Sequence, residues 1–187
     1  MEGKMSELFK PALALIIVTA AAAILLGYVH DVTLEPIAAQ QALAEASAIG
    51  AVFGAADDTS QEVSVPASSP VSRALEVYGG GTLLGYAFFT SPSGYGGAVD
   101  IMVGVNAGGA VVGVQILQHA ETPGLGANAV NAAYTDQYKG KTGDLIVTKA
   151  SPGENEIQAI TSATITSAAV TKGVNDALSF FKQSIQQ

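Results

Sequence analysis

The sequence predicts an α+β protein, with an N-terminal transmembrane helix followed by a mainly antiparallel sheet and flanking helices. Three observations indicate this class: an uncharged apolar run near the N-terminus, consecutive apolar runs separated by turn residues, and a helical pattern towards the C-terminal end. Strands that follow one another without intervening helices favour antiparallel pairing over a wound parallel sheet. We expect residues 1–30 to form a cytoplasmic tip and membrane anchor, 31–70 a helix and polar linker, and 71–187 an extracytoplasmic domain.

The apolar run comprises nineteen residues without a charge, from Pro11 to Val29. A helix of that length covers about 28 Å, close to the roughly 30 Å of bilayer hydrocarbon. Lys4 and Lys10 precede the run and Asp31 follows it, so the positive-inside tendency predicts a single pass through the cytoplasmic (inner) membrane with the main domain outside. A cleaved signal peptide is the alternative, but its apolar core is usually shorter, and no small-residue cleavage site follows this run.

The composition excludes several kinds of site. With no cysteine in the chain, disulfides, thiolate zinc sites and iron–sulfur clusters are ruled out. His30 and His119 are the only histidines, so we expect no metal site. The region after His30 carries six basic and fourteen acidic residues, which disfavours nucleic acid as a partner.

The elements after the anchor follow from local patterns. Residues 33–53 are rich in Ala, Gln, Glu and Leu and predict a helix that begins near Glu35-Pro36, and the polar residues 55–70 predict a loose loop. The turn residues Asn106–Gly109 predict a hairpin. Apolar runs bounded by Gly, Ser, Pro or Asn predict four strands and a further short one, at residues 75–78, 83–89, 99–105, 111–117 and 145–148.

A cluster of hydroxyl side chains precedes the C-terminal helix. Five hydroxyls fall within seven residues: Thr161, Ser162, Thr164, Thr166 and Ser167. The apolar residues that follow have a helical period: Val170, Val174, Ala177, Leu178, Phe181 and Ile185. The cluster is therefore expected at a helix N-terminus, which favours an anionic group such as phosphate. An ordinary Ser/Thr helix cap is the alternative, although a cap accounts for one hydroxyl and not for five.

A second polar cluster lies at His119–Gly126. Pro123 and Gly124 predict a type II turn, and Gly126 permits the close approach of another group. A tight turn alone accounts for the proline and glycine. It does not account for His119, Glu121 and Thr122 beside them.

Thr161-Ser162-Ala163-Thr164 resembles the flavinylation motif of membrane FMN-binding domains, found in the G subunit of the Rnf electron-transport complex and the C subunit of the sodium-pumping NADH:quinone oxidoreductase. His119–Gly126 and Gly94–Gly97 resemble two further segments of the same family, in the same order. The chain departs from the family pattern at Ser162, where glycine is usual, and at Gln158, where aspartate is common.

The resemblance implies an FMN-binding domain in which Thr164 carries FMN through a phosphoester bond. Around the phosphate it places the neighbouring motif residues Thr161, Ser162, Ala163, Thr166 and Ser167. Tyr95 and Leu125 are expected to pack on the isoalloxazine ring, with Gly126 close by and His119, Glu121 and Thr122 at the rim. Thr166 is the rival attachment point.

The same resemblance implies an electron-carrier subunit of an Rnf-type, ion-translocating oxidoreductase that transfers electrons between ferredoxin and NAD. Its expected partners are the other subunits and a flavin transferase that attaches the cofactor. No side chain is expected to act as a catalyst, since the flavin carries the electrons. Two alternatives stay open: a stand-alone membrane-anchored FMN domain of another system, and a non-redox ligand-binding module.

Overall fold

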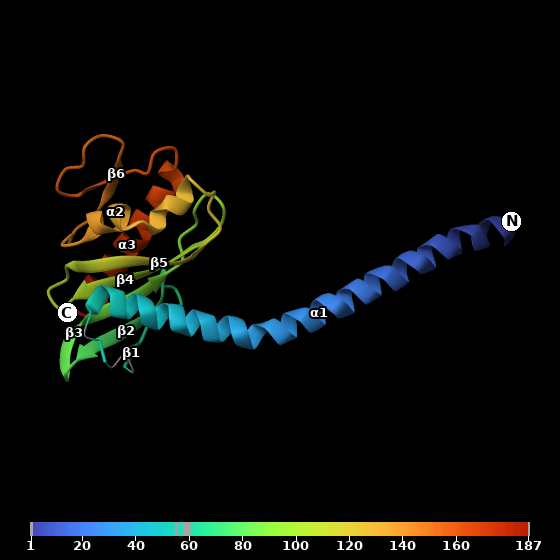
Figure 1. Cartoon of the computed structure of the whole chain (residues 1–187), viewed down its shortest axis with the longest axis horizontal. Coiled ribbons are helices and arrows are strands. Elements are labelled where there is room, and N and C mark those ends of the chain that lie inside the picture. Colours follow the sequence, from blue (N-terminus) through green and yellow to red (C-terminus); the bar gives the residue numbers. More distant parts are fainter. Residues whose placement is uncertain (1, 55, 58–60, 187) are drawn as a thin grey trace. The chain divides into compact units, whose positions relative to one another are not determined.

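The computed structural model describes residues 2–54, 56–57 and 61–186, and the chain divides into two compact units, residues 1–43 and 44–187. The first unit belongs to helix α1 (Glu2–Phe53), which continues into the second (Figure 1). Among the described residues, α1 is the one helix long and apolar enough to cross a membrane, judged by length and composition.

Helix α1 is longer than the sequence suggested. A membrane helix and a separate helix starting near Glu35-Pro36 were expected, but the structure has one uninterrupted helix with Pro11 and Pro36 inside it. An internal proline removes one backbone hydrogen bond without necessarily ending a helix. The Ala, Leu, Gln and Glu residues that follow Pro36 are strong helix formers and continue the helix to Phe53.

The second unit is built on a five-stranded antiparallel sheet in the order β1-β2-β3-β4-β5 (Figure 1). The four long strands confirm the predicted runs and extend them: β2 (Val71–Gly79), β3 (Thr82–Thr90), β4 (Val99–Asn106) and β5 (Val111–His119). The short β1 (Glu62–Val63) lies in the segment expected to be a loop, and residues 55 and 58–60 of that segment lie outside the described residues.

Both faces of the sheet are covered. Alternate residues such as Phe88, Ile101 and Val103 pack against helix α3 (Thr164–Ser184) on one face. On the other face Ala87, Phe89 and Met102 pack against the last turns of α1, through Ala48, Ile49, Val52 and Phe53. Burying a large apolar side chain stabilises a fold by about 1.5–3 kcal/mol. Because neither face meets water along much of its length, the strands read as nearly continuous apolar runs rather than alternating ones.

Because α1 packs on the sheet, the separate segment of helix and linker is shorter than the sequence predicted. Residues 44–53 belong to the same compact unit as the strands, whereas the sequence pattern placed 31–70 in a separate helix and linker. Gly104 and Gly113 make this contact possible, since a Cβ on either would press on Val52. The sequence showed these glycines inside strands without showing which element approaches them.

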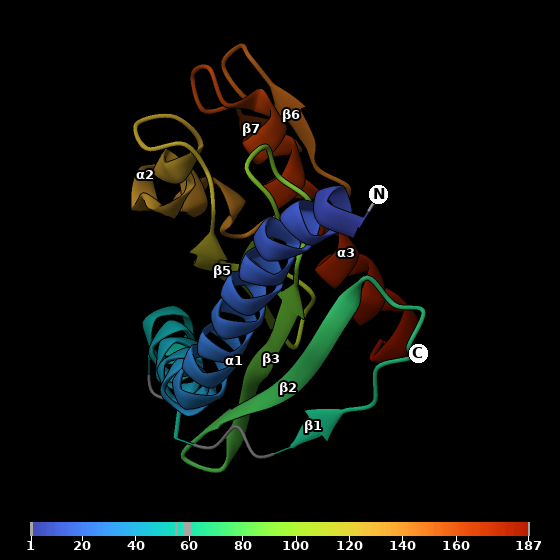
Figure 2. The same cartoon turned by 90° about the vertical axis from the view of Figure 1, so that its right-hand side faces the viewer.

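The segment between β5 and α3 holds short elements: η1 (Gly126–Val130), α2 (Ala132–Thr135), η2 (Asp136–Tyr138), β6 (Ile146–Thr148) and β7 (Glu156–Gln158). The short strand predicted near residue 145 is β6. Its parallel partner β7 was not predicted, and the pair lies near α3 (Figure 2). Helix α3 confirms the predicted period, with Val170, Val174, Ala177, Leu178 and Phe181 buried and Ile185 half-buried just beyond its end.

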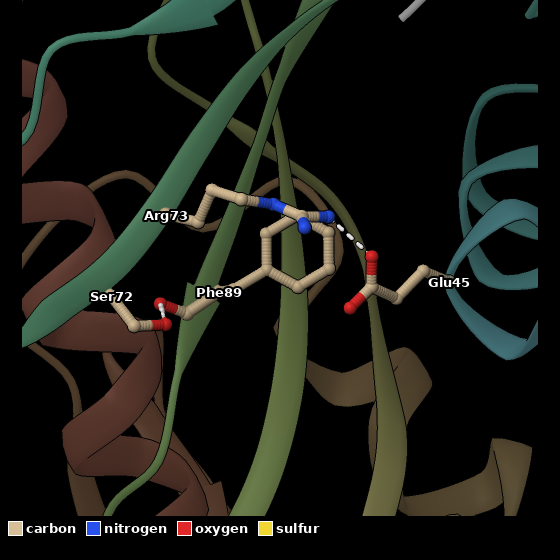
Figure 3. A network of polar contacts seen from close by, with 4 residues as sticks. All are labelled: Glu45, Ser72, Arg73 and Phe89. Atoms are coloured by element: carbon tan, nitrogen blue, oxygen red, sulfur yellow. Dashed lines mark hydrogen bonds and ion pairs between the residues drawn. The ribbon is translucent and has the colours of Figure 1, made fainter. Parts of the chain in front are cut away.

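A polar contact joins the end of α1 to the sheet. The Arg73 guanidinium lies over the Phe89 ring, 4.5 Å from its centroid, and forms an ion pair with Glu45 of α1 (Figure 3). Beside it, the Ser72 hydroxyl donates to the Phe89 carbonyl at 3.0 Å. Arginine suits this position because its planar guanidinium can stack on a ring and pair with a carboxylate at the same time.

We expect Glu45 and Arg73 to be energetically coupled. In a double-mutant cycle of Glu45→Gln and Arg73→Gln, the coupling should be about 0.5 kcal/mol, because the pair is partly exposed. Urea unfolding of the full chain in detergent measures it. The exposed pair Asp136 and Lys139 is the control, and a coupling no larger than the control's would show that the contact does not hold α1 to the sheet.

Candidate functional site

Three segments far apart in the sequence meet around a cavity of about 610 Å³. They are the Gly94–Gly97 loop, the loop that follows β5, and the start of α3. Nine of the twelve predicted site residues line this cavity: Tyr95, Glu121, Thr122, Leu125, Gly126, Ser162, Ala163, Thr164 and Thr166. His119, Thr161 and Ser167 do not line it, and Ile165 lines it although it was not predicted.

The Glu121 carboxylate connects the three segments. Its side chain is buried, with 6% of the residue exposed. One carboxylate oxygen accepts the backbone amides of Tyr95 and Gly96 at 2.8 and 3.0 Å, and the other accepts the Thr166 hydroxyl at 2.6 Å. Glu121 was expected at the rim of a flavin slot. It lines the cavity as a largely buried side chain, and its hydrogen bonds offset the cost of burying a charge.

The hydrogen bonds also set the ionisation of Glu121. Burial raises the pKa of this carboxyl, but the Thr166 hydroxyl, the Gly96 and Tyr95 amides and His119 together outweigh burial and lower the pKa below its usual value. Glu121 is therefore a carboxylate at neutral pH. The His119 ring supports the same loop, since its Nδ1 accepts the Glu121 amide at 3.2 Å.

The glycines of the two loops leave room for this carboxylate. A Cβ on Gly94 or Gly126 would collide with the Glu121 carboxylate, and one on Gly96 would collide with the Ala120 carbonyl. The sequence predicted a close approach at Gly126. The group that approaches it is the protein's own buried carboxylate together with the Thr166 hydroxyl.

The predicted type II turn at Pro123-Gly124 is confirmed. Gly124 has φ of 78°, and the Leu125 amide donates to the Thr122 carbonyl at 3.1 Å across the turn. The turn places Thr122 and Leu125 on the cavity wall.

Helix α3 begins at the cavity without a side-chain cap. Its first residue is Thr164, and Ala163 at the N-cap position supplies no side-chain hydrogen bond. Side chains usually satisfy some of the free N–H groups of a first turn. Here those groups are left for solvent or for a ligand, and the helix dipole adds partial positive charge.

The five hydroxyls divide into two groups. Thr161, Ser162 and Thr164 are exposed. Thr166 and Ser167 are buried and already bonded: Thr166 donates to Glu121, and Ser167 accepts the Ile160 amide at 2.9 Å and donates to the Ala163 carbonyl at 3.0 Å. These two hydroxyls hold the start of α3 in place, and they cannot donate to a ligand without breaking those bonds.

Two buried tyrosines support the start of α3 from behind. The Tyr134 and Tyr138 hydroxyls lie 2.8 Å apart, Tyr134 donates to the Ser167 carbonyl at 3.2 Å, and Tyr138 lies 2.8 Å from the Thr171 hydroxyl. Burial raises the pKa of both tyrosines, so both stay neutral. This network was not predicted. Tyr134 and Tyr138 are four residues apart, and that helical spacing is the one signal available for it in the sequence.

Ser162 has an unusual backbone conformation. Its φ is 62°, in the left-handed region, in a turn that the Ala163 amide closes by donating to the Ile160 carbonyl at 2.9 Å. Glycine is favoured at such a position, and serine there costs roughly 1–2 kcal/mol. Replacing the family's usual glycine with serine therefore costs more free energy than the small size of serine suggests. Gln158, the other departure, is exposed at the end of β7 and does not line the cavity.

A comparison with known families identifies this part of the chain as an FMN-binding domain. The family model described as "FMN-binding domain" matches residues 94–179, which include all three segments around the cavity. A solved structure from Parabacteroides distasonis, of the C subunit of the Na⁺-translocating NADH-quinone reductase, has the same fold. Its TM-score is 0.53 and its identity 21%, over 62% of this chain and 63% of that one.

Two curated relatives match along nearly the whole chain. The G subunit of the Na⁺-translocating ferredoxin:NAD⁺ oxidoreductase complex of Acetobacterium woodii is 38% identical, over 93% of this chain and 91% of its own. The G subunit of the ion-translocating oxidoreductase complex of Methanosarcina acetivorans is 28% identical, over 93% and 94%. The chain therefore belongs to the family of G subunits of ion-translocating oxidoreductase complexes.

Glu121→Gln is expected to lower the free energy of unfolding by about 1–3 kcal/mol at pH 7, because charge-assisted hydrogen bonds are replaced by neutral ones. The folded-state pKa of Glu121 is lowered, so its contribution is fully present above the unfolded pKa of about 4.3 and is lost as pH falls through the folded pKa. Denaturant unfolding from pH 7 to pH 3 should show the difference between the two proteins shrinking. A difference independent of pH would mean that the Glu121 charge does not stabilise the loops.

Ser162→Gly is expected to raise the free energy of unfolding by about 1 kcal/mol, because glycine adopts a positive φ without strain. Ser162→Ala removes the same hydroxyl but keeps the strain, so it should not stabilise the protein. Thermal unfolding of both variants in the flavin-free chain measures the effect. Equal stability of the two would show that the left-handed backbone costs nothing.

Proposed function

We propose that this chain carries covalently bound FMN on Thr164 and relays electrons within a membrane-bound ion-translocating oxidoreductase. The observation that carries the proposal is Thr164 itself: it is the first residue of an uncapped helix, its side chain is exposed, and it lines the cavity. The family supplies the setting, since the relatives are named as subunits of ferredoxin:NAD⁺ oxidoreductase complexes.

The cavity fits FMN in size and in the character of its walls. Its volume lies within the range of about 300–1,000 Å³ typical of small-molecule sites. Tyr95, Leu125 and Ile165 line it and are 71%, 41% and 55% exposed, so they offer uncovered apolar surface to a flat ring. The N-terminus of α3 suits the phosphate group of FMN. The isoalloxazine ring would then pack against the apolar walls.

Attachment through Thr164 is favoured over attachment through Thr166. The Thr166 hydroxyl is buried and donates its proton to Glu121, whereas Thr164 is exposed. A flavin transferase needs an accessible oxygen: the Thr164 oxygen forms the new P–O bond, a P–O bond of an activated flavin phosphate donor breaks, and the hydroxyl proton leaves with the departing group.

A covalent bond also compensates for weak electrostatic binding. Among the described residues that line the cavity, Glu121 is the one charged side chain, so neither lysine nor arginine holds the phosphate there. A phosphate held by helix amides alone would dissociate readily outside the cytoplasm. We place the domain on that side because positive charge precedes the apolar part of α1 and acidic residues follow it.

Once bound, FMN supplies the electron transfer, and the side chains hold and orient it. Glu121 fixes both loops against the start of α3, and the Pro123-Gly124 turn shapes one wall. The other subunits of the complex are the electron-transfer partners. A stand-alone FMN domain is less well supported, since relatives named as members of such complexes match over almost the entire chain.

Thr164→Val is expected to abolish covalent flavin and leave the fold intact, because valine is nearly isosteric with threonine. The chain is made in a host that contains a flavin transferase, and covalent flavin is read as fluorescence of the band after denaturing electrophoresis. Thr166→Val is the matched control: it should keep the flavin but lower stability by about 1–3 kcal/mol, since Glu121 loses a partner. A fluorescent Thr164→Val band would contradict the assignment.

A further inference from the structure

The strained backbone at Ser162 calls for a functional reason. Ser162 is the one residue other than glycine that has a positive φ in the part of the chain that the structure describes. Glycine at this position would remove the strain. Loss of the side chain would leave no gap in the packing, because Ser162 is exposed. Strained backbone conformations of this kind cluster at active sites and ligand-binding sites.

No contact with the residues that the structure describes accounts for the serine. Its hydroxyl makes no hydrogen bond to any described residue, and the cap position of α3 has no side-chain bond. The side chain does line the cavity, two residues before Thr164. A hydroxyl kept at a strained position without a protein partner is available to a ligand.

A phosphate at Thr164 has few donors to choose from. The cavity wall, as far as the structure describes it, contains no lysine, arginine or histidine. The hydroxyls of Thr166 and Ser167 donate to Glu121 and to the Ala163 carbonyl. The donors left at the start of α3 are its first-turn amides and the Ser162 hydroxyl, while the Thr122 and Tyr95 hydroxyls lie on the two loops.

We propose that Ser162 is a phosphate-positioning residue, whose hydroxyl donates a hydrogen bond to a non-bridging oxygen of the flavin phosphodiester on Thr164. The inference rests on the proposed function and adds to it a contact that glycine at this position could not make. The hydrogen bond offsets the backbone strain only when the flavin is attached.

The test is ³¹P NMR of the flavinylated full chain in detergent, with Ser162→Ala, Ser162→Gly and the control Ser151→Ala. Ser151 is an exposed serine that does not line the cavity. We expect Ser162→Ala and Ser162→Gly to move the phosphodiester resonance in the same direction and by a similar amount, because both remove the hydroxyl. Ser151→Ala should leave the resonance in place.

Two results would overturn the inference. If neither Ser162 variant moves the resonance, the hydroxyl does not contact the phosphate. If Ser162→Gly moves it and Ser162→Ala does not, the resonance reports the backbone conformation and not the hydroxyl. A wild-type chain with no phosphodiester on Thr164 would overturn the proposed function as well. If instead the Ser162 variants carry the flavin adduct and their phosphodiester resonance is unchanged from the wild type, only the inference about Ser162 fails.

Discussion

The buried Glu121 carboxylate is the interaction on which the site depends. It accepts hydrogen bonds from the loop before β4 and from the first turn of α3, and its own backbone lies in the loop after β5. A buried charge with these bonds is stable, whereas the same charge without them would be costly. Because one carboxylate joins all three segments, the position of each segment depends on the positions of the other two. Thr164 lies two residues before Thr166, so the proposed attachment point is held through the same contact.

Much of the fold could be predicted from the sequence, because local patterns encode it. Four long strands followed from apolar runs between turn residues, and α3 followed from the spacing of Val170, Val174 and Phe181. Local patterns carry less information about which element covers which surface. The packing of the end of α1 on one face of the sheet depends on contacts between residues distant in the chain. The parallel pairing of β6 with β7 depends on such contacts as well. The continuity of α1 through Pro36 could not be predicted from the sequence either, because proline occurs both at helix starts and at helix interruptions.

The site shows the same division. The residue types of the three segments identified the region and the family, and most of the predicted residues line one cavity. The role of each hydroxyl could not be predicted, since Thr164 and Thr166 look equivalent in sequence. Burial and a hydrogen bond to Glu121 separate them, and that partner lies 45 positions away in the chain. Likewise the sequence showed serine in place of glycine at residue 162, but only the backbone angle shows what that exchange costs.

The proposed function depends on one exposed threonine at the start of α3. Trypsin cleavage after Lys149 and Lys172 yields a peptide, residues 150–172, that contains Thr161, Thr164 and Thr166 together. Tandem mass spectrometry of this peptide, from wild-type chain made alongside a flavin transferase, is the most direct measurement. If Thr164 carries the flavin, the fragment ions will localise an FMN-derived mass to that residue. The same mass on Thr166 or Thr161, or an unmodified peptide, would contradict the assignment.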